Sequence, residues 1–258
     1  MSTPGLVVLA HGSPDPRSRA ALSEVLGLLR TQAPGLVCTA AFLNHHGPTL
    51  ADTARAASRC GLEDLVVVPY LLTSAYHARI DVPAALTRAR TAAPGLHVRA
   101  TPPLAGHPAL LDAAARRADP HPTAAVVLAA GGSSDPDGAQ QVHAAAAAIQ
   151  TRLGRPVVAA FAGHQPPTIR DAIQDLREQG MPAVVVPYLL APGLLADRIA
   201  AQGTDSGAPT TRPLGPSHEI AAAVVSRCAE ARPRRRPRAP REPPPPQPGA
   251  LGPAAPAR

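Results

Sequence analysis

Two histidines, His11 and His77, are the residues of this chain best placed to do chemistry. Each follows an apolar run typical of a buried strand, residues 6–10 before His11 and residues 65–72 before His77. In an open parallel sheet, ligands collect in the crevice beyond the carboxyl ends of the strands. Two imidazoles there would supply half of a ligand shell for iron, cobalt, nickel or zinc. The alternative is a pair of unrelated loop histidines.

The chain is internally doubled, and the two copies differ at both histidines. Four segments return in order in the second half, three of them at a spacing of 118 or 119 residues: 7–10 and 126–129, 41–50 and 160–169, 66–72 and 184–190, and more loosely 104–108 and 214–218. His11 falls opposite Ala130 or Gly131, and His77 falls opposite Ala196. Structural histidines would be needed in both copies. Their joint loss therefore favours one chemically active half and one supporting half.

Strands and helices alternate through both copies, which predicts an α/β fold with parallel sheets and right-handed crossovers. Expected strands are 5–10, 36–43, 65–71, 97–100, 124–129, 157–161, 183–189 and 210–212, and expected helices are 18–31, 49–61, 82–92, 108–117, 139–153, 168–180, 194–201 and 219–231. We expect two lobes, 1–120 with the metal histidines and 121–231 as a degenerate repeat. A ligand would bind in the cleft between them.

The last 27 residues, 232–258, differ from the rest in composition. They are rich in proline and contain seven arginines against one glutamate, a net +6 of the +7 carried by the 258-residue chain. We expect this tail to be disordered. A basic tail can contact nucleic acid, but a solvated tail without a fixed partner is the favoured interpretation, and the body lacks a basic stripe.

Cysteine content and hydropathy exclude several classes of protein. Cys38, Cys60 and Cys228 form no Cys-x-x-Cys pair, which argues against a disulfide framework, a zinc ribbon or an iron–sulfur cluster. The chain opens with no recognisable leader and has no apolar run of about 18 residues, so we expect a cytoplasmic protein without a membrane segment.

Three further residues near the histidines have two interpretations each. Ser13 could bind a substrate carboxylate at a helix N-terminus, or could be an ordinary turn residue. Asp81 could orient the His77 imidazole, although an N-cap for the next helix is favoured. The ring of Tyr76 could pack on a flat ligand or against its own loop.

Three motifs in order resemble those of the class II tetrapyrrole chelatases: His11-Gly12-Ser13, the Ala-Phe-Leu and Pro-Thr-Leu pair within 41–50, and Val-Pro-Tyr-Leu-Leu-x(4)-His-x(3)-Asp-Val-Pro within 68–83. The sirohydrochlorin chelatases of sirohaem and cobalamin synthesis are the most similar branch, and the resemblance covers about residues 5–231. It implies a chelatase-like pair of Rossmann-like lobes that hold the tetrapyrrole between them. It also implies a lyase that inserts a divalent metal into the macrocycle without ATP.

The same resemblance assigns roles to residues. It implies that His11 is a metal ligand and proton acceptor and that His77 is the second ligand. It implies that the loop of Leu72, Thr73, Ser74, Ala75 and Tyr76 contacts the macrocycle. Arg17, Arg19 and Arg79 lie near these motifs and could bind its acidic substituents, although solvated surface charges are the favoured interpretation.

One residue departs from the family pattern. Where relatives carry glutamate after Ala-Phe-Leu, this chain has Asn44, followed by His45 and His46. An amide can hydrogen-bond to a substrate but cannot accept a proton. His45 is a candidate replacement for the carboxylate. The favoured alternative makes His45 and His46 an exposed loop pair.

These observations predict a monomeric enzyme whose partners are sirohydrochlorin and a metal ion, with no permanently bound cofactor. The metal, Fe²⁺ or Co²⁺, would be a substrate, and the sequence does not decide between them. A non-catalytic tetrapyrrole or metal carrier is the main alternative. A nucleotide-binding protein is disfavoured because neither Gly-x-Gly-x-x-Gly nor Gly-x(4)-Gly-Lys-[Ser/Thr] occurs.

Overall fold

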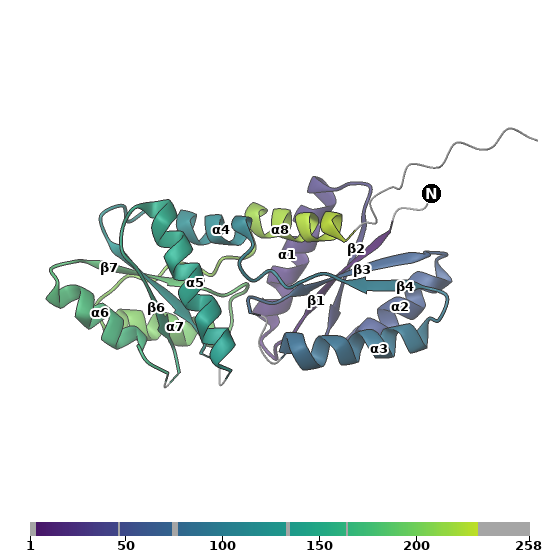
Figure 1. The fold of residues 1–258 in the computed structure, drawn as a ribbon, viewed down its shortest axis with the longest axis horizontal. Coiled ribbons are helices and arrows are strands. Elements are labelled where there is room, and N and C mark those ends of the chain that lie inside the picture. The colour runs from purple at the N-terminus through teal and green to yellow at the C-terminus, as the bar shows by residue number, and fades with distance from the viewer. Residues whose placement is uncertain (1–3, 46, 74–76, 133–134, 164, 232–258) are drawn as a thin grey trace, which may run out of the picture.

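A computed structural model describes residues 4–45, 47–73, 77–132, 135–163 and 165–231. They form two α/β lobes that lie side by side along the long axis of the molecule (Figure 1). The fold class predicted from the sequence is confirmed. The tail expected to be disordered lies outside the described residues.

The first lobe is built on a four-stranded parallel sheet with the order β2-β1-β3-β4. Its strands are β1 (Gly5–Ala10), β2 (Val37–Phe42), β3 (Asp64–Tyr70) and β4 (His97–Ala100). Every residue of β1 is buried, as expected for a central parallel strand with helices on both faces. Ala10 pairs with Tyr70, so β1 and β3 end level with each other.

Helices cover both faces of this sheet. They are α1 (Pro16–Gln32), α2 (Leu50–Arg59) and α3 (Val82–Ala92), and α3 is preceded by a π-helical turn, η1 (His77–Asp81). The side chain of Asp15 caps α1, and Thr49 with Asp52 forms a capping box at α2. Buried residues of α2 and α3 share one core cluster with Val7 and Val67, whereas α1 packs on the opposite face.

The second lobe repeats this plan with a three-stranded sheet of order β6-β5-β7. Its elements are β5 (Ala125–Ala130), α5 (Pro136–Leu153), β6 (Val157–Phe161), α6 (Ile169–Glu178), β7 (Ala183–Pro187) and α7 (Leu194–Asp205). The strand expected at 210–212 is wrong, because only an isolated bridge joins Thr210 to Val185. Pro209 and Pro213 flank this stretch, and proline limits strand pairing.

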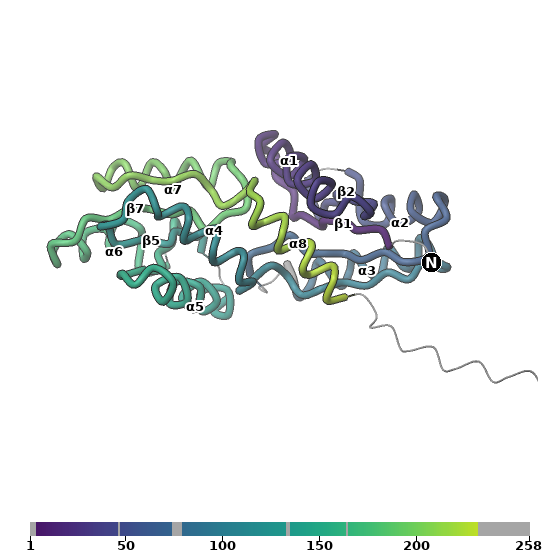
Figure 2. Tube along the Cα trace, turned by 90° about the horizontal axis from the view of Figure 1, so that it is seen from above, coloured from purple at the N-terminus to yellow at the C-terminus, as the bar shows by residue number. Residues whose placement is uncertain are grey.

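The two helices that end the halves are exchanged between the lobes. Figure 1 shows α4 (Pro108–Ala118) over the second lobe, where it contacts α5 and β7, and α8 (His218–Glu230) over the first lobe. Seen from above in Figure 2, α8 runs beside α1, and Gln32 of α1 donates to the carbonyl oxygen of His218. Each sheet is therefore covered by a helix from the other half of the chain.

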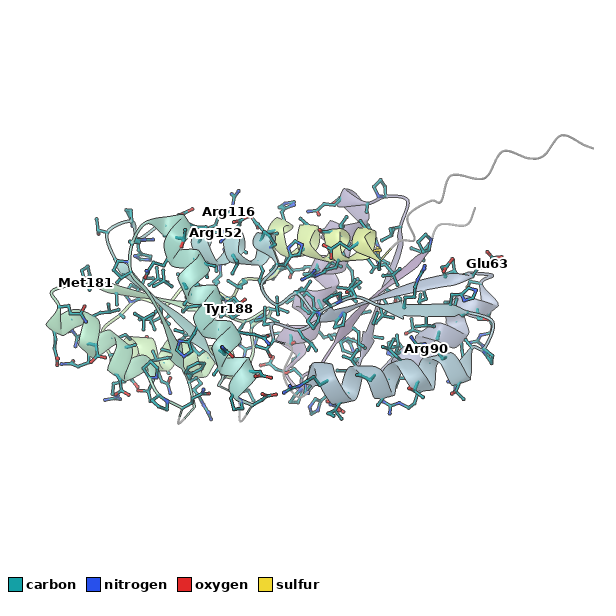
Figure 3. All side chains as sticks on the ribbon, in the orientation of Figure 1. Glu63, Arg90, Arg116, Arg152, Met181 and Tyr188 are labelled. Atoms are coloured by element: carbon teal, nitrogen blue, oxygen red, sulfur yellow. The ribbon has the colours of Figure 1, made fainter. Side chains whose placement is uncertain are left out.

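The exchange joins the lobes through one continuous apolar core. Buried residues of α1, α4, α5 and α8 belong to the same cluster, with the inward side chains of both sheets. Two ion pairs connect these helices at the edge of the core. Arg116 of α4 pairs with Glu219 of α8 (3.0 Å). Arg152 of α5 pairs with Asp112 of α4 (2.9 Å). Both arginines lie on the upper side of the molecule in Figure 3. Tyr70, from the first lobe, donates to the carbonyl oxygen of Leu190 in the second (3.4 Å).

Candidate functional site

His11 directly follows the last residue of β1, at the carboxyl edge of the first sheet. The chain leaves β1 toward β2 and leaves β3 toward β4, so the strand order reverses between β1 and β3. Such a switch point is where open α/β sheets bind their ligands. The His11 side chain is half-buried there, and its Nδ1 lies 3.0 Å from the carbonyl oxygen of Gly12. A carbonyl only accepts, so this contact favours the tautomer that leaves a lone pair on Nε2.

The turn after β1 lies directly against the loop after β2. Asn44 donates its backbone N–H to the carbonyl oxygen of His11 (2.9 Å). Gly12 has a φ of +90°, and an ideal Cβ on it would lie 2.0 Å from the carbonyl oxygen of Asn44. Glycine is required at position 12 by both the backbone conformation and the space.

This contact brings His45 next to His11. Their ring centroids are 6.1 Å apart, with a tilt of 54° between the ring planes. His45 is exposed and has a left-handed φ of 66°, which is uncommon for a residue with a side chain. The two rings lie together beside the switch point, whereas His46 lies outside the described residues.

Ser13 and Asp15 form the start of α1. The Ser13 hydroxyl accepts the backbone N–H of Asp15 (3.1 Å), and the Asp15 carboxylate accepts the N–H of Arg17 (2.9 Å). Ser13 thus has the turn role that its sequence context suggested. Carboxylate binding by the same hydroxyl stays a prediction.

The segment after β3 supplies the other side of the switch point. Leu72 and Thr73 are half-buried, and Leu72 packs against the core shared by the lobes. Ser74, Ala75 and Tyr76 lie outside the described residues. His77 is placed through its backbone, as the first residue of η1, and single π-helical turns are frequent at functional sites.

Asp81 does not cap α3 in the way expected. It occupies the position before Val82, but its backbone is helical and its side chain makes no capping hydrogen bond. The physical reason is that η1 runs directly into α3, so no helix start exists at Asp81 for a side chain to cap. A role in orienting His77 stays a prediction.

The second lobe shows what the repeat does at the equivalent positions. Ala10 and Ala130 both end the first strand of their lobes, so Gly131 corresponds to His11. His77 follows Tyr70 by seven residues, and Tyr70 corresponds to Tyr188 in the second lobe. The residue seven positions after Tyr188 is Leu195. The counterpart of His77 is therefore Leu195 and not Ala196 as the sequence repeat predicts. A Cβ on Gly131 would lie 2.8 Å from Leu195 Cδ2. In the second lobe these two positions are therefore in direct contact.

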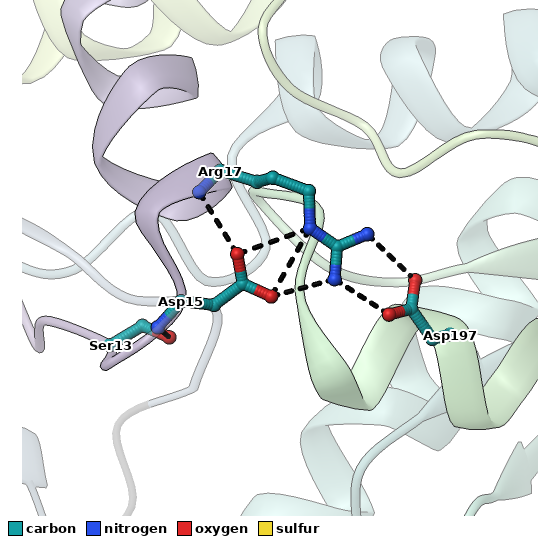
Figure 4. Close-up of polar contacts among 4 residues, drawn as sticks. All are labelled: Ser13, Asp15, Arg17 and Asp197. Atoms are coloured by element: carbon teal, nitrogen blue, oxygen red, sulfur yellow. Dashed lines mark hydrogen bonds and ion pairs between the residues drawn. The ribbon is translucent and has the colours of Figure 1, made fainter.

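Arg17 and Arg79 are exposed arginines, and each forms an ion pair with a carboxylate of the other lobe. Arg17 lies between Asp15 and Asp197 of α7, as Figure 4 shows, with Nη2 2.6 Å from an oxygen of each carboxylate. We call these three residues the first latch. The hydrogen bonds from Arg17 lower the pKa of both Asp15 and Asp197.

Arg79, in η1, pairs across the lobes with Asp135 and Asp137 at the start of α5. Its Nη1 lies 2.9 Å from Asp137 Oδ2. We call these three residues the second latch. Sequence reasoning noted Arg17 and Arg79 but did not find their partners, because residues more than 50 positions away are joined only by the packing of the lobes. Arg19 is exposed.

Within the described ranges, no group of three or more His, Cys, Asp or Glu side chains could hold a metal ion. Over the same residues, no helix is long and apolar enough to span a membrane.

Comparison with known proteins agrees with this arrangement of two α/β lobes. A family model described as CbiX matches residues 5–120 and 125–231, so the chain belongs to the CbiX family. The resemblance to class II chelatases is thereby confirmed.

Named relatives and solved structures fit this family. The sirohydrochlorin ferrochelatase of Bacillus subtilis (strain 168) is 26% identical over 200 residues, covering 75% of this chain and 77% of its own. The sirohydrochlorin cobaltochelatase of Priestia megaterium is 24% identical over 205 residues, covering 75% and 66%. The structure of SirB from Bacillus subtilis with Fe³⁺ superimposes with a TM-score of 0.79 at 24% identity, covering 88% of this chain and 95% of that one.

Proposed function

We propose that this protein inserts a divalent metal, Fe²⁺ or Co²⁺, into sirohydrochlorin. The observation that carries the proposal is the placement of His11 and His77 after two level, hydrogen-bonded strands in a chain of the CbiX family. The named relatives are a ferrochelatase and a cobaltochelatase for this macrocycle. In this role the metal is a substrate that enters and leaves with each turnover.

His11 and His77 are the proposed metal ligands. Neutral imidazole binds iron and cobalt well, and the Gly12 carbonyl favours the His11 tautomer with its lone pair on Nε2. The contact between Gly131 and Leu195 in the second lobe supports the approach of the two histidines, since the repeat places them at the same two positions. With two protein ligands, the remaining positions stay open to water and then to the pyrrole nitrogens.

Two pyrrole N–H protons must leave as the metal enters the ring. His45 and His11 are the proposed acceptors, because their rings lie together at the switch point. His11 would accept its proton on Nε2 once the metal has passed to the ring and freed that lone pair. A positioned base contributes about 10²–10⁴-fold to such a step. Asn44 accepts no proton, so its role would be to hydrogen-bond a substituent of the macrocycle.

The macrocycle would bind between the turn after β1 and the loop after β3. Ser13, Asn44 and residues 72–76 would supply hydroxyl, amide and apolar contacts. The exposed Arg19 is a candidate for binding a peripheral carboxylate, whereas Arg17 and Arg79 are already paired.

A metal or tetrapyrrole carrier is the second candidate, and Asn44 favours it. Without a carboxylate at that position, the site could bind both ligands yet lack enough basicity to speed insertion. A carrier would bind Co²⁺ and sirohydrochlorin with no gain in insertion rate over the uncatalysed reaction.

The deciding experiment measures insertion of Fe²⁺ and Co²⁺ into sirohydrochlorin by absorbance, with wild type, His11→Ala, His77→Ala and His97→Ala. His97 is exposed on the edge strand β4 and serves as the matched control. We expect losses of about 10²-fold or more in the first two variants and none in the third. Equal rates in all four proteins would reject the site.

A further inference from the structure

The two latches occupy equivalent positions of the internal repeat, with their charges exchanged. Asp15 and Asp135 are the N-caps of α1 and α5, and their carboxylates are only 9% and 14% exposed. Arg17 and Asp137 each lie two residues beyond that cap. In both latches an arginine therefore reaches a largely buried capping carboxylate.

The partner across the lobes also sits at an equivalent position. Arg79 follows Tyr70 by nine residues, and Asp197 follows Tyr188 by nine. In the first latch the helix start carries arginine and the segment after the third strand carries aspartate. In the second latch the helix start carries aspartate and that segment carries arginine. The same joint is thus made twice with reversed polarity.

We propose that Arg79 is a positioning residue that holds the turn carrying His77 in place against the second lobe. Arg79 lies two residues after His77 within the five-residue turn η1, and both of its ion pairs reach α5 of the other lobe. The first latch cannot position a metal-binding histidine, because α7, which supplies Asp197, carries no histidine. The proposal rests on the proposed role of His77 as a metal ligand.

The geometry explains why this anchor matters for so short an element. η1 is continuous with α3 at its C-terminal end only, and the first turn of a helical run lacks part of the hydrogen bonding that fixes the interior of a helix. Ile80, beside Arg79, is 52% exposed and contributes little burial. Two guanidinium contacts to separate carboxylates restrict the turn in more than one direction, which a single ion pair does not do.

The test compares Arg79→Gln with Asp197→Asn. Each replaces one charged group by a neutral amide and removes ion pairing between the lobes, but only the first acts on η1. Titration with Co²⁺, followed by absorbance in the absence of macrocycle, reports the metal site directly.

We expect Arg79→Gln to weaken Co²⁺ binding about three- to tenfold, a modest effect because Arg79 is half exposed. Its KM for Co²⁺ should rise while kcat changes little. Asp197→Asn should stay within about twofold of wild type.

A charge exchange provides the rescue. Arg79→Asp with Asp137→Arg rebuilds the second latch in the polarity of the first, and we expect it to restore most of the Co²⁺ affinity. If Arg79→Gln does not fold, Asp137→Asn weakens the same joint without changing η1 and should lower the affinity in the same direction.

Three outcomes separate the possible failures. The positioning role would be overturned if Arg79→Gln kept wild-type Co²⁺ affinity, or if Asp197→Asn lost as much affinity as Arg79→Gln. Both latches would then only connect the two lobes. Co²⁺ binding by His77→Ala equal to wild type would overturn the proposed role of His77 as a metal ligand, on which the inference rests. Loss in His77→Ala with no loss in Arg79→Gln would overturn only the inference about Arg79.

Discussion

The carbonyl oxygen of Asn44 occupies the space where Gly12 would carry a side chain, 2.0 Å from an ideal Cβ position. This contact holds the His11 turn against the loop that presents His45, and it depends on a φ of +90° at Gly12. No residue with a side chain can keep both the conformation and the distance.

Gly12→Ala should therefore separate the two loops. We expect a loss of about 1–3 kcal/mol in the free energy of unfolding, together with weaker Co²⁺ binding. The matched control is Gly132→Ala, which has a nearly identical φ of +88° but a nearest atom 3.6 Å away. It shares the backbone strain without the clash. Urea denaturation measures the free energy of unfolding of both variants. An equal loss of stability in the two would show that the close approach to Asn44 has no effect of its own.

His45→Asn tests the second proposed base. Asparagine tolerates the left-handed conformation, so the loop should keep its shape while the ring beside His11 is removed. We expect the insertion rate to fall about 10²-fold with unchanged Co²⁺ binding. His97→Asn is the control. A rate equal to wild type would return His45 to the status of an exposed loop residue.

His107 should make the stability of the fold depend on pH. It is 9% exposed and caps α4 by accepting the backbone N–H of Ala109 at its Nδ1 (3.3 Å). Burial, with a smaller contribution from Arg227, lowers its pKa below the usual 6.5. The unfolded chain then takes up the proton first, so this contribution is complete above pH 6.5 and is lost as pH falls through the lowered pKa.

His107→Asn keeps a good capping side chain and removes this titration. Thermal melts at pH 7.5 and 5 should show a smaller drop for the variant than for wild type. Identical drops would mean that His107 does not carry the pH dependence.

Tyr70→Phe tests the bond between the lobes. Removing the hydroxyl leaves the Leu190 carbonyl without this donor, and the O···O distance of 3.4 Å places the cost near the lower end of about 0.5–1.5 kcal/mol. The midpoint of urea denaturation should fall with an unchanged slope. A midpoint equal to wild type would mean that this long hydrogen bond does not stabilise the joint.

Strands and most helices could be predicted because their signals are local. The apolar runs predicted β1 and β3, and Val82–Ala92 was predicted with its observed bounds. Helices α1 and α5 begin earlier than expected, at Pro16 and Pro136. The sequence Asp-Pro marks both starts, as an N-cap followed by proline in the first turn, and this signal was missed.

Relations between distant segments could not be predicted. An amphipathic helix shows which of its faces is buried but not which sheet it covers, so the exchange of α4 and α8 is absent from the pattern. For the same reason the partners of Arg17 and Arg79 were not found. The His45 ring lies near His11 because the backbone of His45 is left-handed. Histidine does not require this conformation, so the sequence gives no sign of it.

The exchange of α4 and α8 has a consequence for biosynthesis. Domains fold as units while the chain is made, and the N-terminal one usually folds first. Here the helix that covers β3 and α1 is α8, residues 218–230. The lobe that carries His11 is translated first but can close only after nearly the whole chain has left the ribosome. A nascent chain halted before residue 218 would present an uncovered apolar face, and the half that carries His11 would be the last part of the molecule to mature.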